Sequence, residues 1–486
     1  MNIPPKQQTF EELLCGIDTL ETSGDLSCEI SSIAYDSRRV TPGALFVALP
    51  GAQVDGSVYI EEAATRGAVG VVTQSPCVFG GSFPCAQVSN ARFALARLAG
   101  TFYGHPAARL STVGITGTNG KTTVSFMVRA IFKAAGRRPG LIGTVRYEIG
   151  KRELPASRTT PEAPDVQSML FQMDRSGCDS AVMEVSSHAL DQCRVEGIPF
   201  NIGVFTNLTQ DHLDYHGTLE EYFRVKARLF DQVKDTAVIN RDDPCGHRLL
   251  SERRLEADAV SYGFEEGALV RGVNPKNDAN GSRMTVESPW GTIDISLQLI
   301  GRFNLYNALA AFAAAASVGI PLETIRDALA AMENIPGRLE SVGTKHKRVY
   351  VDYAHTDDAL RNVLNALRDI TPGRLVVVFG CGGNRDAGKR RLMGEVAARL
   401  ADYSVITNDN PRNEIPEKIA ADIAAGFDSE RKYEICLDRT AAIARGIELI
   451  GKKDVLLVAG KGHETVQEIG GAIFPFDDRE AVREIL

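Results

Sequence analysis

Residues 111–123 read STVGITGTNGKTT, and this stretch decides the fold of the middle of the chain. Its first six residues form an apolar, β-branched run that is typical of a buried strand. The glycine-rich turn GTNGKTT follows, and apolar residues then recur with helical spacing as far as Ala135. A strand, a glycine-rich turn and an amphipathic helix in this order indicate phosphate binding, because backbone amides and the helix N-terminus attract the anion.

The turn departs from the usual phosphate-loop spacing. G-x-x-x-x-G-K-[ST] would need glycine at position 115, which is Ile115, whereas the nearby glycines are Gly114 and Gly117. Lys121 can still reach the β- and γ-phosphates, and the Thr122 hydroxyl can bind Mg²⁺. A glycine-rich turn with a surface lysine is the alternative, and we favour nucleotide binding by Gly117, Thr118, Asn119, Gly120, Lys121, Thr122 and Thr123.

Similar strands recur on both sides of this stretch. Apolar runs that end in polar turns occur at 141–145, 180–186, 202–207 and 236–240, and again at 348–354, 374–380, 403–409 and 454–460. Such runs, alternating with helices, predict parallel sheets covered on both faces. The first hundred residues hold shorter strands. Helix breakers at 104–106 and 334–337 therefore suggest an α/β protein of three domains, 1–108, 109–336 and 337–486, with the phosphate loop in the central parallel sheet.

Length and composition agree with three domains and exclude other classes. The chain has 486 residues, which is about three domains at ~150 residues each. Its 54 Lys and Arg against 62 Asp and Glu give a net charge of −8, which argues against a nucleic-acid partner. No apolar run reaches the ~18 residues of a membrane span, and 309–320 is better explained as a buried helix. The N-terminus lacks a signal-peptide pattern, so we expect a cytoplasmic protein.

The nine cysteines contain no CxxC pair and predict no zinc site. Cys77 and Cys85 are close in sequence, which leaves a disulfide between them open. Scattered reduced thiols are the favoured interpretation for a cytosolic chain.

Polar residues follow two of the central strands. Glu184 and Ser186 end one strand, and the next ends in TNLTQDHLDYHG, which supplies Asp211, His212, Asp214 and His216. Ligands bind beyond the carboxyl ends of parallel strands, and Mg²⁺ prefers oxygen ligands. A carboxylate here could therefore complete a magnesium site beside a nucleotide. Without the other motifs, a structural hydrogen-bonding role is the favoured interpretation for His212. For Lys226, which lies on a predicted helix, the favoured interpretation is a solvated side chain.

Four segments carry a resemblance to a known family: GTNGKTT, MEVSSHAL (183–190), TNLTQDHLDYHG with Lys226, and GRFNLYNALAA (301–311). Together with DSRRVTPGALFVAL (36–49) and DNPR (409–412), they resemble the ATP-dependent Mur ligases of bacterial cell-wall synthesis over essentially the whole chain. The resemblance implies a UDP-sugar domain, an ATPase domain and a Rossmann-like amino-acid domain. It also implies amide ligation through an acyl phosphate, with meso-diaminopimelate added to UDP-N-acetylmuramoyl-L-alanyl-D-glutamate.

The resemblance also implies roles for individual residues. Lys121, Glu184, His212 and Lys226 would be catalytic, with Lys226 carbamylated to N6-carboxylysine. Mg²⁺ would be held by Thr122, Glu184, His212 and Lys226. The nucleotide would further contact Asn304, Asn307, Arg338, Asp352 and His355. The UDP-muramoyl dipeptide would contact Tyr35, Ser37, Gln53, Thr159, Thr160, Ser186, Gln192 and Arg194.

The amino-acid site would comprise Arg385, Asp409, Asn410, Pro411, Arg412, Gly460 and Glu464. Diaminopimelate has a second carboxylate that lysine lacks, and Arg412 can hold it with a charge-assisted pair. The alternatives are another ligase of the superfamily, either L-lysine-adding or folylpolyglutamate synthetase-like, and a non-catalytic nucleotide-binding scaffold. We expect a monomer whose partners are small-molecule substrates.

Overall fold

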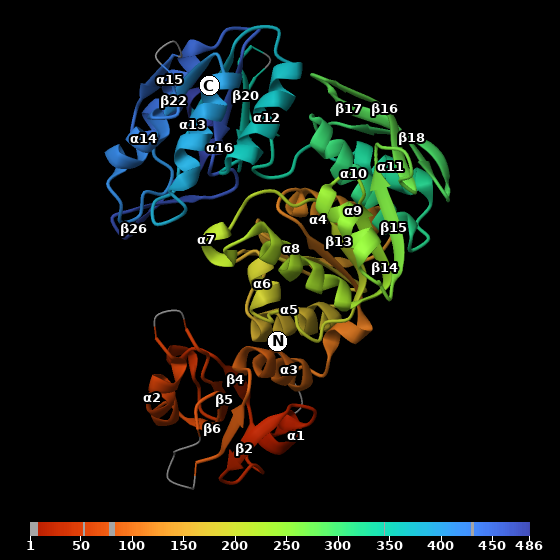
Figure 1. The fold of residues 1–486 in the computed structure, drawn as a ribbon, viewed down its shortest axis with the longest axis vertical. Helices are drawn as coiled ribbons and strands as arrows, with labels where there is room; N and C mark the ends of the chain where they lie inside the picture. Colours follow the sequence, from red (N-terminus) through yellow and green to blue (C-terminus); the bar gives the residue numbers. More distant parts are fainter. Residues whose placement is uncertain (1–7, 52–53, 77–82, 345, 429–431) are drawn as a thin grey trace.

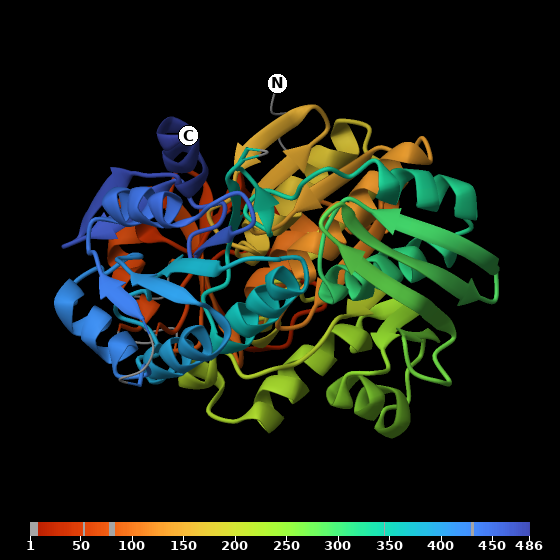
Figure 2. The same cartoon turned by 90° about the horizontal axis from the view of Figure 1, so that it is seen from above.

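The computed structural model describes residues 8–51, 54–76, 83–344, 346–428 and 432–486. Three separate main sheets form along the chain, which confirms the prediction of three α/β domains. Figure 1 shows the N-terminal domain at one end, the central domain in the middle and the C-terminal domain at the other end. Figure 2, seen from above, shows the C-terminal domain beside the central one.

The N-terminal sheet has five strands in the order β2-β7-β6-β5-β4. Four of these strands are parallel, and β2 pairs antiparallel with β7. Their bounds are β2 Thr19–Ser23, β4 Ser32–Ala34, β5 Ala44–Val47, β6 Ala68–Thr73 and β7 Cys85–Val88. Helix α3 (Ala91–Phe102) packs on the sheet, and the residue before it, Asn90, caps its N-terminus by accepting from two backbone amides. This cap satisfies donors that a helix start leaves free.

The favoured interpretation of reduced thiols is wrong at Cys85, for which the sequence left a disulfide open. Cys85, in β7, is disulfide-bonded, whereas seven other cysteines in the described ranges are free. Cys77 lies outside the described residues.

The central sheet has eleven strands in the order β11-β10-β9-β12-β8-β13-β14-β15-β16-β17-β18. The strands from β9 to β16 run parallel, with β8 between β12 and β13, and the apolar runs predicted five of these seven strands, all but β15 and β16. The bounds of this parallel part are β8 Ser111–Thr116, β9 Pro139–Ile142, β12 Ser180–Glu184, β13 Phe200–Phe205, β14 Val233–Asn240, β15 Asp258–Gly263 and β16 Val270–Asp278.

Antiparallel strands extend both edges of this sheet, and the sequence analysis did not predict them. They are β10 (Arg146–Ile149) and β11 (Arg152–Pro155) at one edge, and β17 (Gly281–Ser288) and β18 (Gly291–Leu297) at the other. Strands β11, β17 and β18 are exposed on one face or both, and β10, although mostly buried, has only four residues, two of them charged. Their pattern therefore lacks the continuous apolar run that identifies the parallel strands.

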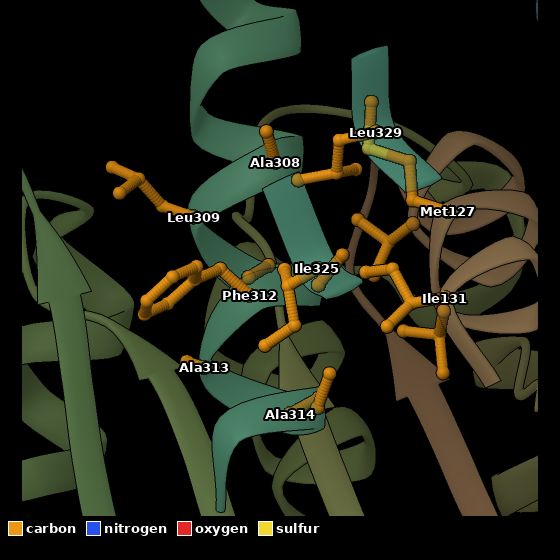
Figure 3. Close-up of a cluster of buried hydrophobic side chains, with 14 of the residues drawn as sticks. Met127, Ile131, Ala308, Leu309, Phe312, Ala313, Ala314, Ile325 and Leu329 are labelled. Atoms are coloured by element: carbon orange, nitrogen blue, oxygen red, sulfur yellow. The ribbon is translucent and has the colours of Figure 1, made fainter. Parts of the chain in front are cut away.

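Helices cover both faces of the central sheet. On one face, α4 (Lys121–Ala134), α10 (Arg302–Ala316) and α11 (Leu322–Ala330) share one apolar core with the sheet. Figure 3 shows Ile325 and Leu329 on the side of Met127 and Ile131 of α4, whereas the ring of Phe312 points away from α4. On the other face, α5 (Ala163–Arg175), α8 (Leu219–Ala227) and α9 (Pro244–Glu252) pack on a second core.

The alanine-rich segment at 309–320 lies largely in α10, whose residues Leu309 to Ala316 are at most 2% exposed. Small side chains let α10 approach the sheet and α4 closely, so the apolar run serves packing within the domain. Among the helices of the described ranges, none combines the length and the apolar character that crossing a membrane requires.

The C-terminal sheet has six strands in the order β19-β20-β24-β21-β22-β23, all parallel except β19. Helices α12 (Asp357–Asp369), α13 (Gly388–Leu400) and α14 (Pro416–Ala424) pack on one face, and α15 (Arg439–Leu449) and α16 (Asp478–Ile485) on the other. The strand bounds are β19 Glu340–Ser341, β20 Arg348–Asp352, β21 Leu375–Phe379, β22 Tyr403–Ile406, β23 Tyr433–Ile435 and β24 Val455–Ala459. A hairpin of β25 (Val466–Ile469) and β26 (Ala472–Pro475) follows β24.

Candidate active site

The backbone of the turn after β8 adopts a conformation that depends on two glycines. Gly117 and Gly120 have φ angles of +143° and +88°, which L side chains rarely adopt. A Cβ on Gly117 would clash with the Thr206 hydroxyl, and one on Gly120 with the Asn307 side chain. Helix α4 then begins at Lys121. The loop therefore presents a helix N-terminus and close-packed backbone where phosphate binding is predicted.

Lys121 lies folded over this turn. Its ammonium donates to the carbonyl oxygens of Gly117 and Thr118, each at 2.8 Å. Burial lowers the pKa of Lys121, and the nearby carboxylates of Glu184 and Asp211 oppose that shift. Because its present partners are neutral carbonyl oxygens, the Lys121 ammonium can bind a phosphate anion in this turn.

Glu184 is fully buried at the end of β12 and faces the turn. Its carboxylate accepts from the hydroxyls of Thr122 at 2.9 Å and Thr144 at 2.8 Å, and from the Thr144 amide at 2.8 Å. The Thr122 hydroxyl and this carboxylate form an oxygen pair beside the turn, which is the donor chemistry that Mg²⁺ prefers. The sequence analysis missed Thr144, because no motif identifies a threonine in a loop.

Lys226 contradicts the expectation of a solvated helix lysine. Its side chain, on α8, is 1% exposed, and its ammonium donates to the Gly117 carbonyl at 2.8 Å. The ammonium also lies 4.6 Å from the centre of the Tyr222 ring. Burial and the neighbouring Lys121 hold the pKa of Lys226 well below its usual range. A lowered pKa favours the neutral amine, which is the form that reacts with carbon dioxide.

His212 and its neighbours differ in their exposure and in their polar partners. His212 has a φ of +54°, and its Nε2 lies 3.4 Å from Asp211 Oδ2. Desolvation lowers its pKa to about 4, so the imidazole is neutral at pH 7 and can act as a ligand. Asp214 is exposed, whereas His216 is buried and bonds the Ser187 hydroxyl at 2.9 Å. The described residues contain no group of three or more His, Cys, Asp or Glu suited to hold a metal by themselves.

The C-terminal domain reaches into the phosphate region. Arg338 donates to the Thr122 hydroxyl at 3.0 Å, and its guanidinium lies 4.7 Å from the centre of the Tyr353 ring. Asp358, at the start of α12, accepts from Asn119 and Thr209 of the central domain, each at 3.1 Å. The sequence analysis missed Asp358. These contacts mean that the two domains meet at the predicted nucleotide loop.

Other predicted nucleotide residues lie around the same junction. Asp352 is buried and accepts from the amides of Leu339 and Ala354, and burial raises its pKa to about 6. Asn307 donates to Asn304 at 3.1 Å on the first turns of α10. The two asparagines and the Gly120 turn are therefore neighbours, as the Asn307 contact with Gly120 also indicates.

The predicted dipeptide residues form a chain that leads away from Glu184. Thr160 donates to the Glu184 carbonyl at 2.8 Å and accepts from the Ser186 amide at 3.1 Å. Arg194 donates to the Thr160 carbonyl at 2.9 Å and to Gln192 at 2.7 Å. Thr159 joins the same network through the Thr144 hydroxyl at 3.1 Å.

A cavity of about 250 Å³ lies between the N-terminal and central domains. It is lined by Tyr35, Arg39, Ser157, Arg158, Pro161, Glu162, Asp165 and Met169. Tyr35 crosses the domain junction and donates to Asp165 at 2.6 Å. Ser37 instead bonds Glu62 of its own domain at 2.9 Å and is 6% exposed, so it does not line this cavity. Gln53 lies outside the described residues.

The predicted amino-acid residues meet at the carboxyl ends of β21, β22 and β24. Asn410 donates to Glu464 at 2.9 Å, and Arg412 donates to the Gly383 carbonyl at 2.7 Å. A Cβ on Gly460 would clash with Asp409, and Arg385 is exposed beside Gly382. Pro411 accepts a backbone bond from Glu414 at 3.0 Å. The three loops therefore form one polar surface.

Two buried cations that the sequence analysis missed support this surface. Arg439 and Asp478 form an ion pair at 2.7 Å with both side chains fully buried. Arg439 also donates to the carbonyls of Asn408 and Ala459, so it ties the loop after β22 to the end of β24. Arg390 is 2% exposed and pairs with Glu414 and Asp422. No local pattern marks these residues, because their partners are distant in sequence.

An α/β fold with a phosphate-type turn, a buried carboxylate and a second domain closing on it defines a nucleotide-dependent transferase or ligase site. Three family models match consecutive parts of the chain. They are the Mur ligase family, catalytic domain (29–103), the Mur ligase middle domain (115–315) and the Mur ligase, glutamate ligase domain (337–462). The chain belongs to the Mur ligase family.

Among the members of this family, the chain is similar to the diaminopimelate ligases. The UDP-N-acetylmuramoyl-L-alanyl-D-glutamate--2,6-diaminopimelate ligase of Caldanaerobacter subterraneus is 42% identical, with 98% of each chain covered. The ligase of the same name from Geobacillus kaustophilus is 44% identical, with 94% of each covered. A solved structure of a diaminopimelate ligase of that name superposes with a TM-score of 0.70 at 32% identity, covering 99% of this chain and 98% of its own.

Proposed function

We propose that this chain is the ligase that adds meso-diaminopimelate to the D-glutamate of UDP-N-acetylmuramoyl-L-alanyl-D-glutamate, with ATP as co-substrate. The observation that carries the proposal is the link from Arg338 through Thr122 to Glu184, which joins the amino-acid domain to the phosphate turn. The relatives that cover nearly the whole of this chain bear the name of this reaction.

The reaction needs an activated carboxylate. In the proposed sequence, the γ-phosphoryl group of ATP moves to an oxygen of the glutamate γ-carboxylate, and ADP leaves. The amine of diaminopimelate then attacks the acyl carbon, the carbon–oxygen bond to phosphate breaks, and the amine loses a proton. Phosphoryl transfer depends mainly on positioning and charge neutralisation, which Lys121, Arg338 and the amides of the turn can supply. Contact between the domains helps to exclude water, which would hydrolyse the acyl phosphate.

Mg²⁺ fits the donors present. We propose that Thr122, Glu184, His212 and a carbamylated Lys226 hold it, together with phosphate oxygens. The ion would neutralise charge on the phosphates during transfer. The support in this chain is the buried Thr122–Glu184 oxygen pair and the lowered pKa of the buried Lys226 amine. A carbamate on that amine would convert a cation into an anion beside the metal.

The other roles follow the division of the chain into 1–108, 109–336 and 337–486. We assign UDP to the side of Tyr35, Ser37 and Gln53, and the peptide to Thr159, Thr160, Ser186, Gln192 and Arg194. The nucleotide is assigned to 117–123 with Asn304, Asn307, Arg338, Asp352 and His355. Diaminopimelate is assigned to Arg385, Gly460, Glu464 and 409–412. We further propose a cytoplasmic monomer.

One assay tests the proposal. The purified chain is given the UDP-muramoyl dipeptide, ATP and Mg²⁺ with either meso-diaminopimelate or L-lysine, and phosphate release and product mass are measured. We expect a tripeptide product with diaminopimelate. Preference for lysine would favour an L-lysine-adding ligase. No turnover with either donor would favour a folylpolyglutamate synthetase-like ligase or a binding scaffold, and a second assay with a folate, glutamate and ATP separates these two.

A further inference from the structure

Glu468, in β25, carries a charge at the amino-acid site that the proposed function does not use. Arg412 Nε donates to Glu468 Oε2 at 3.1 Å. The Arg412 side chain is 23% exposed and that of Glu468 is 39% exposed. A cation and an anion therefore stand side by side where both remain accessible to a ligand.

The backbone fixes this pair in place. The Arg412 amide donates to the Glu468 carbonyl at 3.0 Å, and the Gly470 amide donates to the Arg412 carbonyl at 2.7 Å. Arg412 has a φ of +52°, a conformation that its neighbours must enforce. Its Nη1 is bonded to the Gly383 carbonyl, and no bond from Nη2 is present within the described part of the chain. One nitrogen of the guanidinium is therefore left for a substrate carboxylate.

A second charge pair lies next to the first. Lys461 is fully buried, and its ammonium lies 3.0 Å from Glu464 Oε2. Asn410 connects the two pairs, because its Oδ1 accepts from Lys461 at 3.0 Å and from the Glu468 amide at 3.1 Å. The site thus holds two cation–anion pairs linked through one amide side chain.

Diaminopimelate has the matching chemistry, since each of its ends carries an ammonium and a carboxylate on one carbon. We infer that Glu468 and Arg412 bind the ammonium and the carboxylate of the distal carbon and thereby select its configuration. The inference rests on the proposed function and adds a specificity-determining residue to it. Inverting the distal carbon would turn the ammonium towards Arg412 and the carboxylate towards Glu468, so both contacts become repulsive.

The test compares three amine donors with the full chain and with Glu468→Gln. The donors are meso-diaminopimelate, LL-diaminopimelate, and L-2-aminopimelate, which keeps the distal carboxylate but lacks the distal ammonium. We expect Glu468→Gln to lower kcat/KM for the meso donor roughly 10- to 100-fold, the effect of losing a charge-assisted hydrogen bond. For L-2-aminopimelate we expect a change of no more than about twofold, and we expect the preference for meso over LL to fall sharply. Glu468→Asp should keep that preference.

Glu395→Gln is the matched control, because Glu395 forms an exposed pair with Arg391 on α13 at 3.0 Å. The ADP dissociation constant and the thermal unfolding midpoint serve as folding checks, and Glu468→Asp carries the comparison if Glu468→Gln does not fold. Equal losses with meso-diaminopimelate and L-2-aminopimelate would mean that Glu468 only positions Arg412, and the inference would be wrong. An unchanged meso-to-LL ratio would also overturn it. If the unaltered chain uses none of the donors, the proposed function itself fails.

Discussion

The turn after β8 and the loop after β22 both follow a parallel strand, but they hold their polar groups differently. At the first, Lys121 and Lys226 are bonded to carbonyl oxygens of the turn itself. At the second, Arg412 is paired with the carboxylate of Glu468. A backbone site can bind any phosphate group of suitable geometry, whereas paired side chains of opposite charge can distinguish one amino acid from another. We therefore expect changes at the turn after β8 to affect phosphoryl transfer, and changes at the loop after β22 to affect the choice of amino acid.

The largest expected effect is at the phosphate turn. Lys121→Ala should lower kcat for phosphate release by about 10³-fold, because a positioned charge on the transferring phosphoryl group is lost. Lys133→Ala, an exposed lysine on the same helix, is the control. Steady-state kinetics with the UDP-muramoyl dipeptide measure the change. Near-normal turnover would remove Lys121 from the proposed machinery.

Arg412→Ala should act on selectivity instead of ATP use. We expect the preference for meso-diaminopimelate over L-lysine to fall roughly 100-fold, since the donor's second carboxylate loses its partner. The two donors are supplied together, and the masses of the products give the preference for meso-diaminopimelate over L-lysine. Arg445→Ala, in an exposed ion pair of the same domain, should leave the ratio unchanged. If Arg412→Ala weakened ADP binding as much as selectivity, the two sites would not be separable.

Lys226→Ala should lower activity by about 10- to 100-fold, the usual effect of losing a group that supports a metal site. Short carboxylic acids added to the variant should restore part of the activity by replacing the carbamate. Arg224→Ala, on the same helix but exposed, is the control. Full activity of Lys226→Ala without additives would contradict the carbamate role.

Tyr35→Phe should give the smallest effect. Removing the hydroxyl breaks the 2.6 Å bond to Asp165 between two domains, and one such bond contributes about 1 kcal/mol. We expect KM for the UDP substrate to rise about fivefold with kcat unchanged. Tyr59→Phe, an exposed tyrosine of the same domain, serves as the control. A fall in kcat instead would move Tyr35 from substrate binding to domain positioning.

The sequence predicted the elements whose pattern is local. Parallel strands with continuous apolar runs, such as β8, and the helices α4 and α10 were predicted because these runs and helical spacing directly reflect burial. The parallel strands β15 and β16 were not predicted. The edge strands β17 and β18 were missed, since partial exposure removes that pattern.

The residues of the candidate site likewise fall into those that a local motif predicts and those that it does not. Sequence motifs identified Lys121, Thr122 and Glu184, which lie close to a strand end or a helix start. They could not identify Thr144, Asp358 or Arg439, because each acts through a partner from another part of the chain. Lys226 shows the limit most clearly, since helical position alone favours exposure and the packing of α8 buries it.

By itself, the sequence determined three α/β domains, the phosphate turn and the motifs that identify the family, because these depend on neighbouring residues and on burial patterns. Only the tertiary structure decided which polar groups meet. It brought Arg338 to Thr122, removed Ser37 from the cavity beside Tyr35, and set Glu468 against Arg412. The physical reason is that a hydrogen bond or an ion pair depends on distance in space, and residues dozens to hundreds of positions apart come within reach only when the sheets and domains have packed.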